Sequence, residues 1–215
     1  MSGTVRFLDQ KQVERLLQVP NTRTATGLRN ACILRTLWET GLRIDECLSL
    51  KLDDINIDAK TVVVRRGKGK KTRTVAWSSE SMTVQLETWL QKAPESQYIF
   101  PVVRSPRGNK GEKLSPNAFR GTFAKYVREA GLPEWVTPHA IRHSFATFFL
   151  RSGGNVFHLQ KALGHANLSQ TQVYTHVVDE DVLDAMRSLH AEDNHGGRPG
   201  AVAESEHARL WRSAT

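Results

Sequence analysis

The stretch TPHAIRH, residues 137–143, gathers two histidines and an arginine within two helical turns of a proline. His139 and Arg142 are three residues apart, so on a helix that starts at the proline they share one face. The N-terminal end of that helix adds positive potential, and this combination is typical of a site for an oxyanion. His139 and His143 also have the spacing of a helical metal site, although Ala140 stands where the zinc-protease motif needs glutamate. The stretch therefore favours anion binding, with a metal site as the minor alternative.

A second cluster of positive charge lies at residues 65–73, RRGKGKKTR, between two β-branched runs. Its two glycines predict the turn of a β-hairpin. The six cations are Arg65, Arg66, Lys68, Lys70, Lys71 and Arg73. In one interpretation they only protect an exposed sheet edge from aggregation. In the other, a flexible turn that carries a lysine contacts DNA phosphates or protonates a leaving oxygen.

Tyr174 is one of three tyrosines in the chain. A tyrosine on a short helix usually packs in the core, and a phenol with a pKa near ~10 is a poor nucleophile at neutral pH. It needs cationic neighbours to react. His165 follows the helix-terminating Gly164 and precedes Tyr174 by nine positions, so a short fold can bring both side chains into one site.

Helical periodicity and capping residues predict the elements that would hold these side chains. Asp9 and Gln12 suit a capping box, Ser115 suits a cap before Pro116 at the first helical position, and Gly41 and Gly164 suit helix ends. The expected helices cover residues 9–19, 27–40, 43–55, 78–93 and 114–132, then a helix from residue 138, and finally 155–163, 169–177 and 179–189. The expected strands are 60–66 and 72–77, with a third over 96–103. Arg43 falls at a junction between two helices, where a side chain can point out of a packed bundle. The sequence therefore predicts an α+β fold, mainly α-helical, with a small antiparallel sheet of about three strands.

Length and composition bound the class of protein. A chain of 215 residues can bury a core, and we expect one domain over residues 1–190 and a polar, disordered tail over 191–215. Thirty Lys and Arg against 22 Asp and Glu give a net charge of +8, which favours a polyanionic partner. Cys32 and Cys47 lie in apolar helical patterns, which is typical of reduced core thiols in an intracellular protein. No apolar stretch approaches the ~20 residues of a membrane span, so we expect a cytoplasmic protein.

Four segments resemble the signature motifs of the tyrosine recombinase (phage integrase) family: TGLRIDECLSLKLDDI, RRGKGKKTRTV, TPHAIRHSFAT and LGHANLSQTQVYTHV. They follow the family's order from about residue 41 to 177. The resemblance implies a DNA breaking-rejoining catalytic fold. It also implies site-specific recombination through a 3'-phosphotyrosyl intermediate, in integration, excision or inversion, with no metal, ATP or other cofactor.

The resemblance further implies a role for each matching residue. Arg43 and Arg142 match the two arginines that clamp the scissile phosphate, and Lys68 matches the general acid for the leaving 5' oxygen. His139 matches a proton-transfer and phosphate-binding position, His165 a position filled by His or Trp, and Tyr174 the nucleophile. Glu46 matches the acidic supporting residue. For the other hairpin cations we expect contacts with the DNA backbone: Arg65, Arg66, Lys70, Lys71 and Arg73.

The expected partner is double-stranded DNA, with DNA-dependent homo-oligomers, such as a tetramer, held through the helix at 179–189. Most family members carry a separate N-terminal core-binding domain, whereas here the catalytic pattern begins almost at Met1. We therefore expect a short form like the fimbrial phase-variation invertases, or a truncated chain, or one that works with a separate core-binding domain or accessory protein. Two alternatives stay open, a type IB topoisomerase-like relaxation activity and a non-catalytic DNA-binding regulator. The complete set of catalytic residues argues against the regulator.

Overall fold

The computed structural model describes residues 6–65, 72–105, 108–165, 171 and 174. The chain divides into two compact units, Met1–Phe145 and Ala146–Thr215. Three expectations lie outside the described residues: the hairpin turn at 66–71, the helix at 179–189 and the tail at 191–215. Most of the expected helix at 169–177 lies outside them too.

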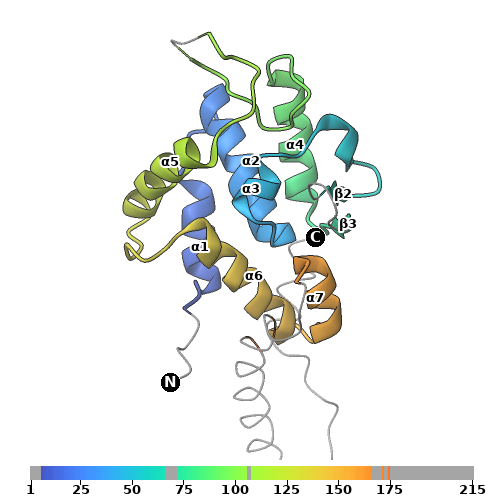
Figure 1. Ribbon diagram of the computed structural model, residues 1–215. Coiled ribbons are helices and arrows are strands. Elements are labelled where there is room, and N and C mark those ends of the chain that lie inside the picture. The colour runs from blue at the N-terminus through green and yellow to red at the C-terminus, as the bar shows by residue number, and fades with distance from the viewer. Residues whose placement is uncertain (1–5, 66–71, 106–107, 166–170, 172–173, 175–215) are drawn as a thin grey trace, which may run out of the picture. The chain divides into compact units, whose positions relative to one another are not determined.

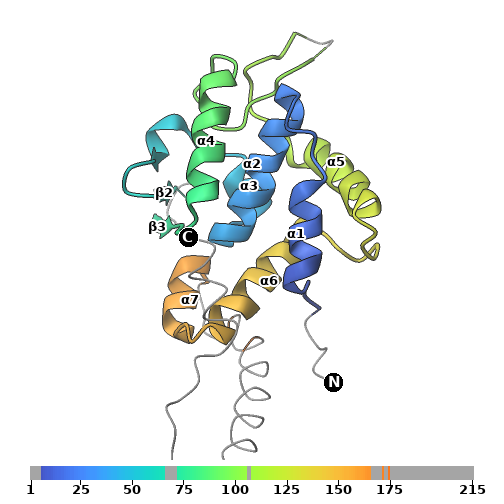
Figure 2. The same cartoon turned by 180° about the vertical axis from the view of Figure 1, so that it is seen from behind.

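The first unit is mainly helical (Figures 1 and 2). Its long helix α2 (Ala25–Thr40) is flanked on one side by α4 (Glu80–Lys92) and on the other by α1 (Gln10–Gln18) and α5 (Pro116–Glu129). The short helix α3 (Ile44–Cys47) and the 3-10 turn η1 (Leu52–Asp54) follow α2, and α6 (Pro138–Arg151) begins in this unit. Leu34 and Leu37 of α2 and Trp89 of α4 are fully buried, which shows where these helices form the core.

Polar caps and glycines determine where these helices begin and end. Asp9 and Gln12 form the predicted capping box at the start of α1. Ser115 accepts a hydrogen bond from the amide of Ala118, and Pro116 takes the first helical position of α5, as predicted. Gly41 ends α2 in the left-handed conformation, with φ of 62°, which favours glycine because it has no Cβ. The chain therefore turns sharply between α2 and α3, directly before Arg43.

The sheet has three antiparallel strands in the order β1 (Ile55–Asn56), β2 (Thr61–Val64) and β3 (Arg73–Ala76). β2 and β3 confirm the predicted hairpin, with Val62 opposite Val75 and Val64 opposite Arg73. The third strand was predicted in the wrong place, at residues 96–103. That segment makes only isolated bridges at Tyr98 and Pro101, and a proline has no N–H to continue a ladder.

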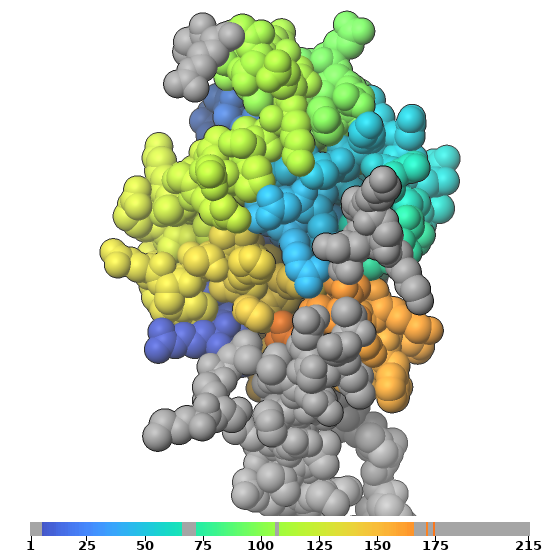
Figure 3. Space-filling model, viewed as in Figure 1, coloured from blue at the N-terminus to red at the C-terminus, as the bar shows by residue number. Residues whose placement is uncertain are grey.

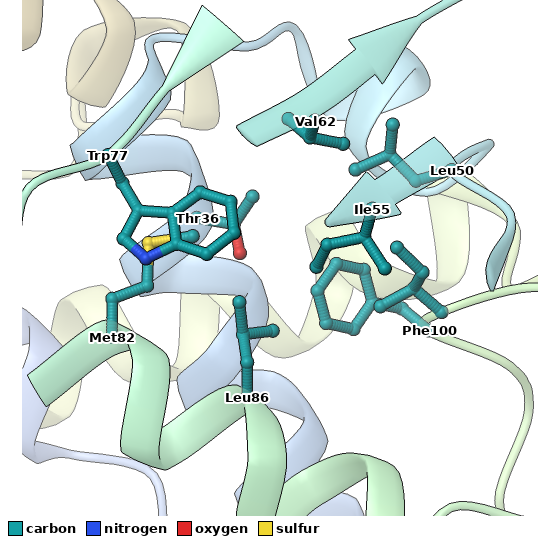
Figure 4. A pocket seen from close by; sticks show the side chains of 9 residues that line it. Thr36, Leu50, Ile55, Val62, Trp77, Met82, Leu86 and Phe100 are labelled. Atoms are coloured by element: carbon teal, nitrogen blue, oxygen red, sulfur yellow. The ribbon is translucent and has the colours of Figure 1, made fainter. Parts of the chain in front are cut away.

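A small apolar cavity of about 10 Å³ lies among α2, α4 and the sheet (Figure 4). Trp77, Met82, Leu86 and Phe100 are among the residues that line it. The hydroxyl of Thr36 lies among these side chains, and within the part of the chain that the structure describes its Oγ1 has no hydrogen-bond partner. The cavity is therefore a packing defect around one buried hydroxyl and is too small for a ligand.

The second unit contains the last turns of α6 and the helix α7 (Val156–Leu163). Asn155 caps α7, and Gly164 ends it with φ of 64°, as predicted. Leu159 and Leu163 form the buried side of α7. Among the described residues of the whole chain, no helix is long and apolar enough to cross a membrane.

Candidate phosphate-binding site

Arg43 lies at the predicted junction, immediately before the first turn of α3. Its backbone has an extended conformation, and its amide donates a hydrogen bond of 3.0 Å to Oε2 of Glu46. Its Nη1 lies 3.4 Å from Oε1 of the same carboxylate. The side chain remains 35% exposed, so Arg43 is fixed at its backbone while its side chain stays partly open to solvent.

Arg142 lies on the first half of α6 and is buried, with 4% of its surface exposed. Its Nη1 donates a hydrogen bond of 2.7 Å to the carbonyl oxygen of Gly41 and lies 4.0 Å from Oε2 of Glu46. The carbonyl of Gly41 is accessible because the left-handed turn ends α2 there. Figure 3 shows the surface of the α2–α3 junction, in light blue, next to the yellow surface of the start of α6. The two predicted clamp arginines are therefore brought together.

Arg73, the first residue of β3, makes a two-pronged ion pair with Glu46. Its Nη1 lies 2.9 Å from Oε1 and its Nη2 lies 2.8 Å from Oε2. Both side chains are nearly buried, with 10% and 12% exposed. The sequence suggested a DNA contact for Arg73, and that role stays a prediction. Its guanidinium donates to both carboxylate oxygens of Glu46.

The carboxylate of Glu46 is therefore the centre of a cluster of three guanidiniums. Burial by itself would raise the pKa of Glu46, but the hydrogen bonds from Arg73 and from the backbone of Arg43, together with their charges, lower it to about 2. Glu46 is ionised at neutral pH, and the cluster of one carboxylate and three arginines carries a net charge of +2.

His139 is exposed in the first turn of α6, and His143 follows one turn later, half-buried. Partial desolvation of its ring, although the residue as a whole is exposed, and then the charges of Arg142, Arg43 and Arg120 lower the pKa of His139, while Asp45 acts in the opposite sense. Burial, His139 and Arg142 lower the pKa of His143. The imidazole of His139 is thus neutral at pH 7, the state that can accept a proton or donate one N–H to an oxyanion.

The sequence left open a metal site at His139 and His143, which would need at least one further ligand. Within the described part of the chain, no group of three or more His, Cys, Asp or Glu side chains is arranged to hold an ion. Cys32 and Cys47 are buried and free, as predicted, and burial raises the pKa of each thiol.

The strands of the hairpin approach the turn at 66–71 with an ion pair on each side. At the end of β2, Arg65 pairs with the buried carboxylate of Asp54. At the start of β3, Arg73 pairs with Glu46. The predicted cations Arg66, Lys68, Lys70 and Lys71 lie outside the described residues.

In the second unit, His165 and Tyr174 are linked through Thr171. Nδ1 of His165 lies 2.9 Å from Oγ1 of Thr171, and the amide of Tyr174 donates to the carbonyl oxygen of Thr171 at 3.0 Å. The amide of His165 closes the end of α7 on Gln160 at 3.1 Å. Tyr174 is 2% exposed. The ring of His165 and the backbone of Tyr174 thus both contact Thr171, a residue that the sequence reasoning did not select, and a shared site for the two side chains stays a prediction.

Comparison with known proteins identifies a family for this arrangement. The sequence model described as the phage integrase family matches residues 6–181. Tyrosine recombinase XerC of Oceanobacillus iheyensis is 34% identical over 197 residues, covering 87% of this chain and 62% of the relative. Tyrosine recombinase XerA of Pyrococcus furiosus is 38% identical over 191 residues, covering 88% of this chain and 63% of the relative. The chain thus spans less than two thirds of the length of these curated relatives.

Solved structures show the same fold. The crystal structure of XerA recombinase superposes with a TM-score of 0.71 at 29% identity, covering 92% of this chain and 67% of that one. XerH site-specific recombinase bound to a palindromic difH substrate gives 0.72 at 26% identity, covering 88% and 54%. The catalytic domain of bacteriophage HP1 integrase gives 0.57 at 24% identity, covering 85% and 94%, and supports the fold alone.

Proposed function

We propose, since this chain belongs to the phage integrase family, that it cleaves and rejoins DNA strands site-specifically through a covalent bond between Tyr174 and a 3' phosphate. The observation that carries the proposal is the cluster around Glu46, which joins Arg43 and Arg142 in a site of net positive charge. Arginine suits this use because its planar fork can hold two phosphate oxygens at once.

In the proposed reaction, the phenolic oxygen of Tyr174 bonds to the scissile phosphorus and the bond from phosphorus to the 5' oxygen breaks. Lys68 supplies the proton that the 5' oxygen takes up, and the neutral imidazole of His139 accepts the phenolic proton. Arg43 and Arg142 stabilise the charge on the non-bridging oxygens. One phosphodiester replaces another, so attack by a second DNA end reverses the step without ATP.

Two properties of the described residues support this assignment of roles. His139 has a lowered pKa and is therefore in its base form at neutral pH. Tyr174 is 2% exposed, so the proposed attack requires that its phenol become accessible to the phosphodiester. His165, held by Thr171, is the nearest described histidine in sequence before this tyrosine and is assigned to phosphate binding.

The proposed partner is double-stranded DNA; among the solved structures, XerH is bound to a palindromic difH substrate and the Tn1549 transposon integrase is in complex with transposon right end DNA. We also propose that the chain assembles on DNA into a homo-oligomer through residues 179–189. It would cooperate there with a separate core-binding domain or accessory protein. Light scattering of the protein on its selected duplex would give the stoichiometry of that complex.

The test begins with selection of duplexes that the chain binds from a random pool. A nick is then placed next to candidate cleavage positions, so that cleavage releases a short 5'-hydroxyl fragment. Once this fragment has diffused away, religation cannot occur and the covalent adduct accumulates. A denaturing gel should show a covalent protein–DNA species for the wild type and none for Tyr174→Phe, which keeps the ring and removes the nucleophile. If both proteins bind the duplex and neither forms the adduct, the proposed function is wrong.

A further inference from the structure

We propose that Arg73 is a positioning residue for the two clamp arginines and acts on them through Glu46; this inference rests on the proposed function. The side chain closes a chain of contacts from β3 to α3 to α6, all within the first unit. Arg73 is thereby separated from the hairpin cations that are expected to contact DNA.

The ion pair of Arg73 with Glu46 is built as a rigid contact. Its two bonds, 2.9 and 2.8 Å, use two guanidinium nitrogens and both carboxylate oxygens. Such a fork fixes the rotation of the carboxylate as well as its position. Because only 10% of the Arg73 side chain is exposed, little of it remains available to a DNA backbone.

The fixed carboxylate determines what Arg43 and Arg142 can do. Oε1 lies 3.4 Å from Nη1 of Arg43, and Oε2 lies 4.0 Å from Nη1 of Arg142. Both distances are longer than those of the Arg73 fork, so Glu46 holds these two guanidiniums less tightly than it holds Arg73. If Arg73 were absent, the carboxylate would be free to turn and pair fully with one of them. That arginine would then be neutralised and no longer directed at a phosphate.

The contact also anchors the hairpin. Arg73 lies opposite Val64 in the β2–β3 register, at the end of the ladder nearest the turn. Its pair with Glu46 therefore fixes the end of β3 to α3, while the pair of Arg65 with Asp54 fixes the end of β2.

The experiment measures single-turnover adduct formation on the nicked duplex at saturating protein, for wild type, Arg73→Ala and Arg73→Lys. A misplaced clamp should lower the rate constant of Arg73→Ala by about 10- to 100-fold, and lysine, which keeps the charge but not the fork, should recover only part of this loss. The amplitude, which reports the folded and active fraction, should not change. The duplex Kd should also stay within about twofold of wild type, and its salt dependence should not change. If Arg73 contacted a DNA phosphate, its loss would weaken binding and make the salt dependence flatter.

Arg35→Ala is the matched control, because Arg35 of α2 also pairs with a glutamate and donates to a neighbouring side chain, and these partners, Glu39 and Gln85, are not members of the cluster. Its rate constant should remain within about twofold of wild type. The inference is overturned if Arg73→Ala keeps the wild-type rate constant, if only its amplitude falls, or if its duplex affinity and salt dependence fall together.

A second readout is independent of catalysis. The carboxyl carbon of Glu46, followed by NMR during an acid titration, should show a higher pKa in Arg73→Ala than in the wild type. An unchanged titration would also overturn the inference. A wild type that forms no adduct would instead overturn the proposed function, and the NMR titration would still decide whether Arg73 controls Glu46.

Discussion

Replacing Glu46 by glutamine should destabilise the first unit, and the loss should depend on pH. The amide has the shape of the carboxylate but lacks its charge, and its NH₂ group would face guanidinium donors. Arg73 and Arg142, both nearly buried, would then lie close together without their shared counter-ion. Removing one member of a buried charged cluster costs more than removing an exposed pair, because the remaining charges are already desolvated.

The magnitude follows from the pKa of Glu46. Its fall from 4.5 to about 2 corresponds to an upper limit of about 3 kcal/mol for the stabilisation of the folded state by the ionised carboxylate. Arg43 is 35% exposed, and solvent screening weakens its share. We therefore expect Glu46→Gln to lower the free energy of unfolding by about 2 to 3 kcal/mol at pH 7.

The pH window follows from the direction of the shift. A carboxyl whose pKa is lowered by folding contributes its full stabilisation above the pKa of the unfolded chain, here 4.5. That contribution is lost as the pH falls towards about 2, the pKa of the folded state. The difference between wild type and Glu46→Gln should therefore be constant from pH 7 to about pH 5 and fall to roughly half by about pH 3.

Urea unfolding followed by tryptophan fluorescence measures this difference at each pH. Glu129→Gln is the control, because Glu129 forms an exposed i, i+4 pair with Lys125 on α5 and should change stability by less than about 0.5 kcal/mol. A Glu46→Gln protein as stable as the wild type at pH 7 would refute the reasoning. So would a loss of the same size at pH 7 and pH 3, because the destabilisation would then not come from the ionised carboxylate.

Two further predictions concern His139 and Thr36. Because the pKa of His139 is lowered, the rate of adduct formation, measured at subsaturating protein, should fall on acidification only below pH 6.5. The variant His139→Gln should not show this fall. A wild-type rate that already falls above pH 6.5 would contradict the base role. Thr36→Val keeps the shape of the side chain and removes the unpaired hydroxyl from the apolar cavity, so urea unfolding should show a gain of about 1 kcal/mol. A loss of stability would mean that the hydroxyl has a partner.

The predictable part of the fold was local. The capping box at Asp9, the Ser115–Pro116 start of α5 and the glycine ends at Gly41 and Gly164 depend on residues a few positions apart, and the structure confirms each one. The hairpin was equally predictable, because two β-branched runs separated by a glycine-containing segment favour two antiparallel strands joined by a turn. Arg43 was correctly placed at a helix junction because the glycine that creates the junction lies two residues before it.

The unpredictable part was long-range pairing. β1 has only two residues, too few for a strand pattern, whereas the apolar run at 96–103 has the composition of a strand but contains a proline. Glu46 and Arg73 are 27 residues apart, and Arg142 and Gly41 are 101 apart. Nothing local distinguishes Arg73 from the other five hairpin cations. Its separate position becomes visible only when the sheet register places it beside α3.

A carboxylate at the centre of a phosphate-binding site would by itself oppose anion binding. Three guanidiniums without a counter-ion would repel one another, and a buried one such as Arg142 would be costly to desolvate. Glu46 removes that cost, and the cluster still keeps a net charge of +2 because one carboxylate neutralises only one of three arginines. The arginines can thus be positioned before DNA arrives. A bound phosphate then meets positive charges that are already in place, and no free energy is spent on ordering the arginine side chains. This preorganisation requires that the carboxylate itself does not turn, and the fork of Arg73 meets that requirement.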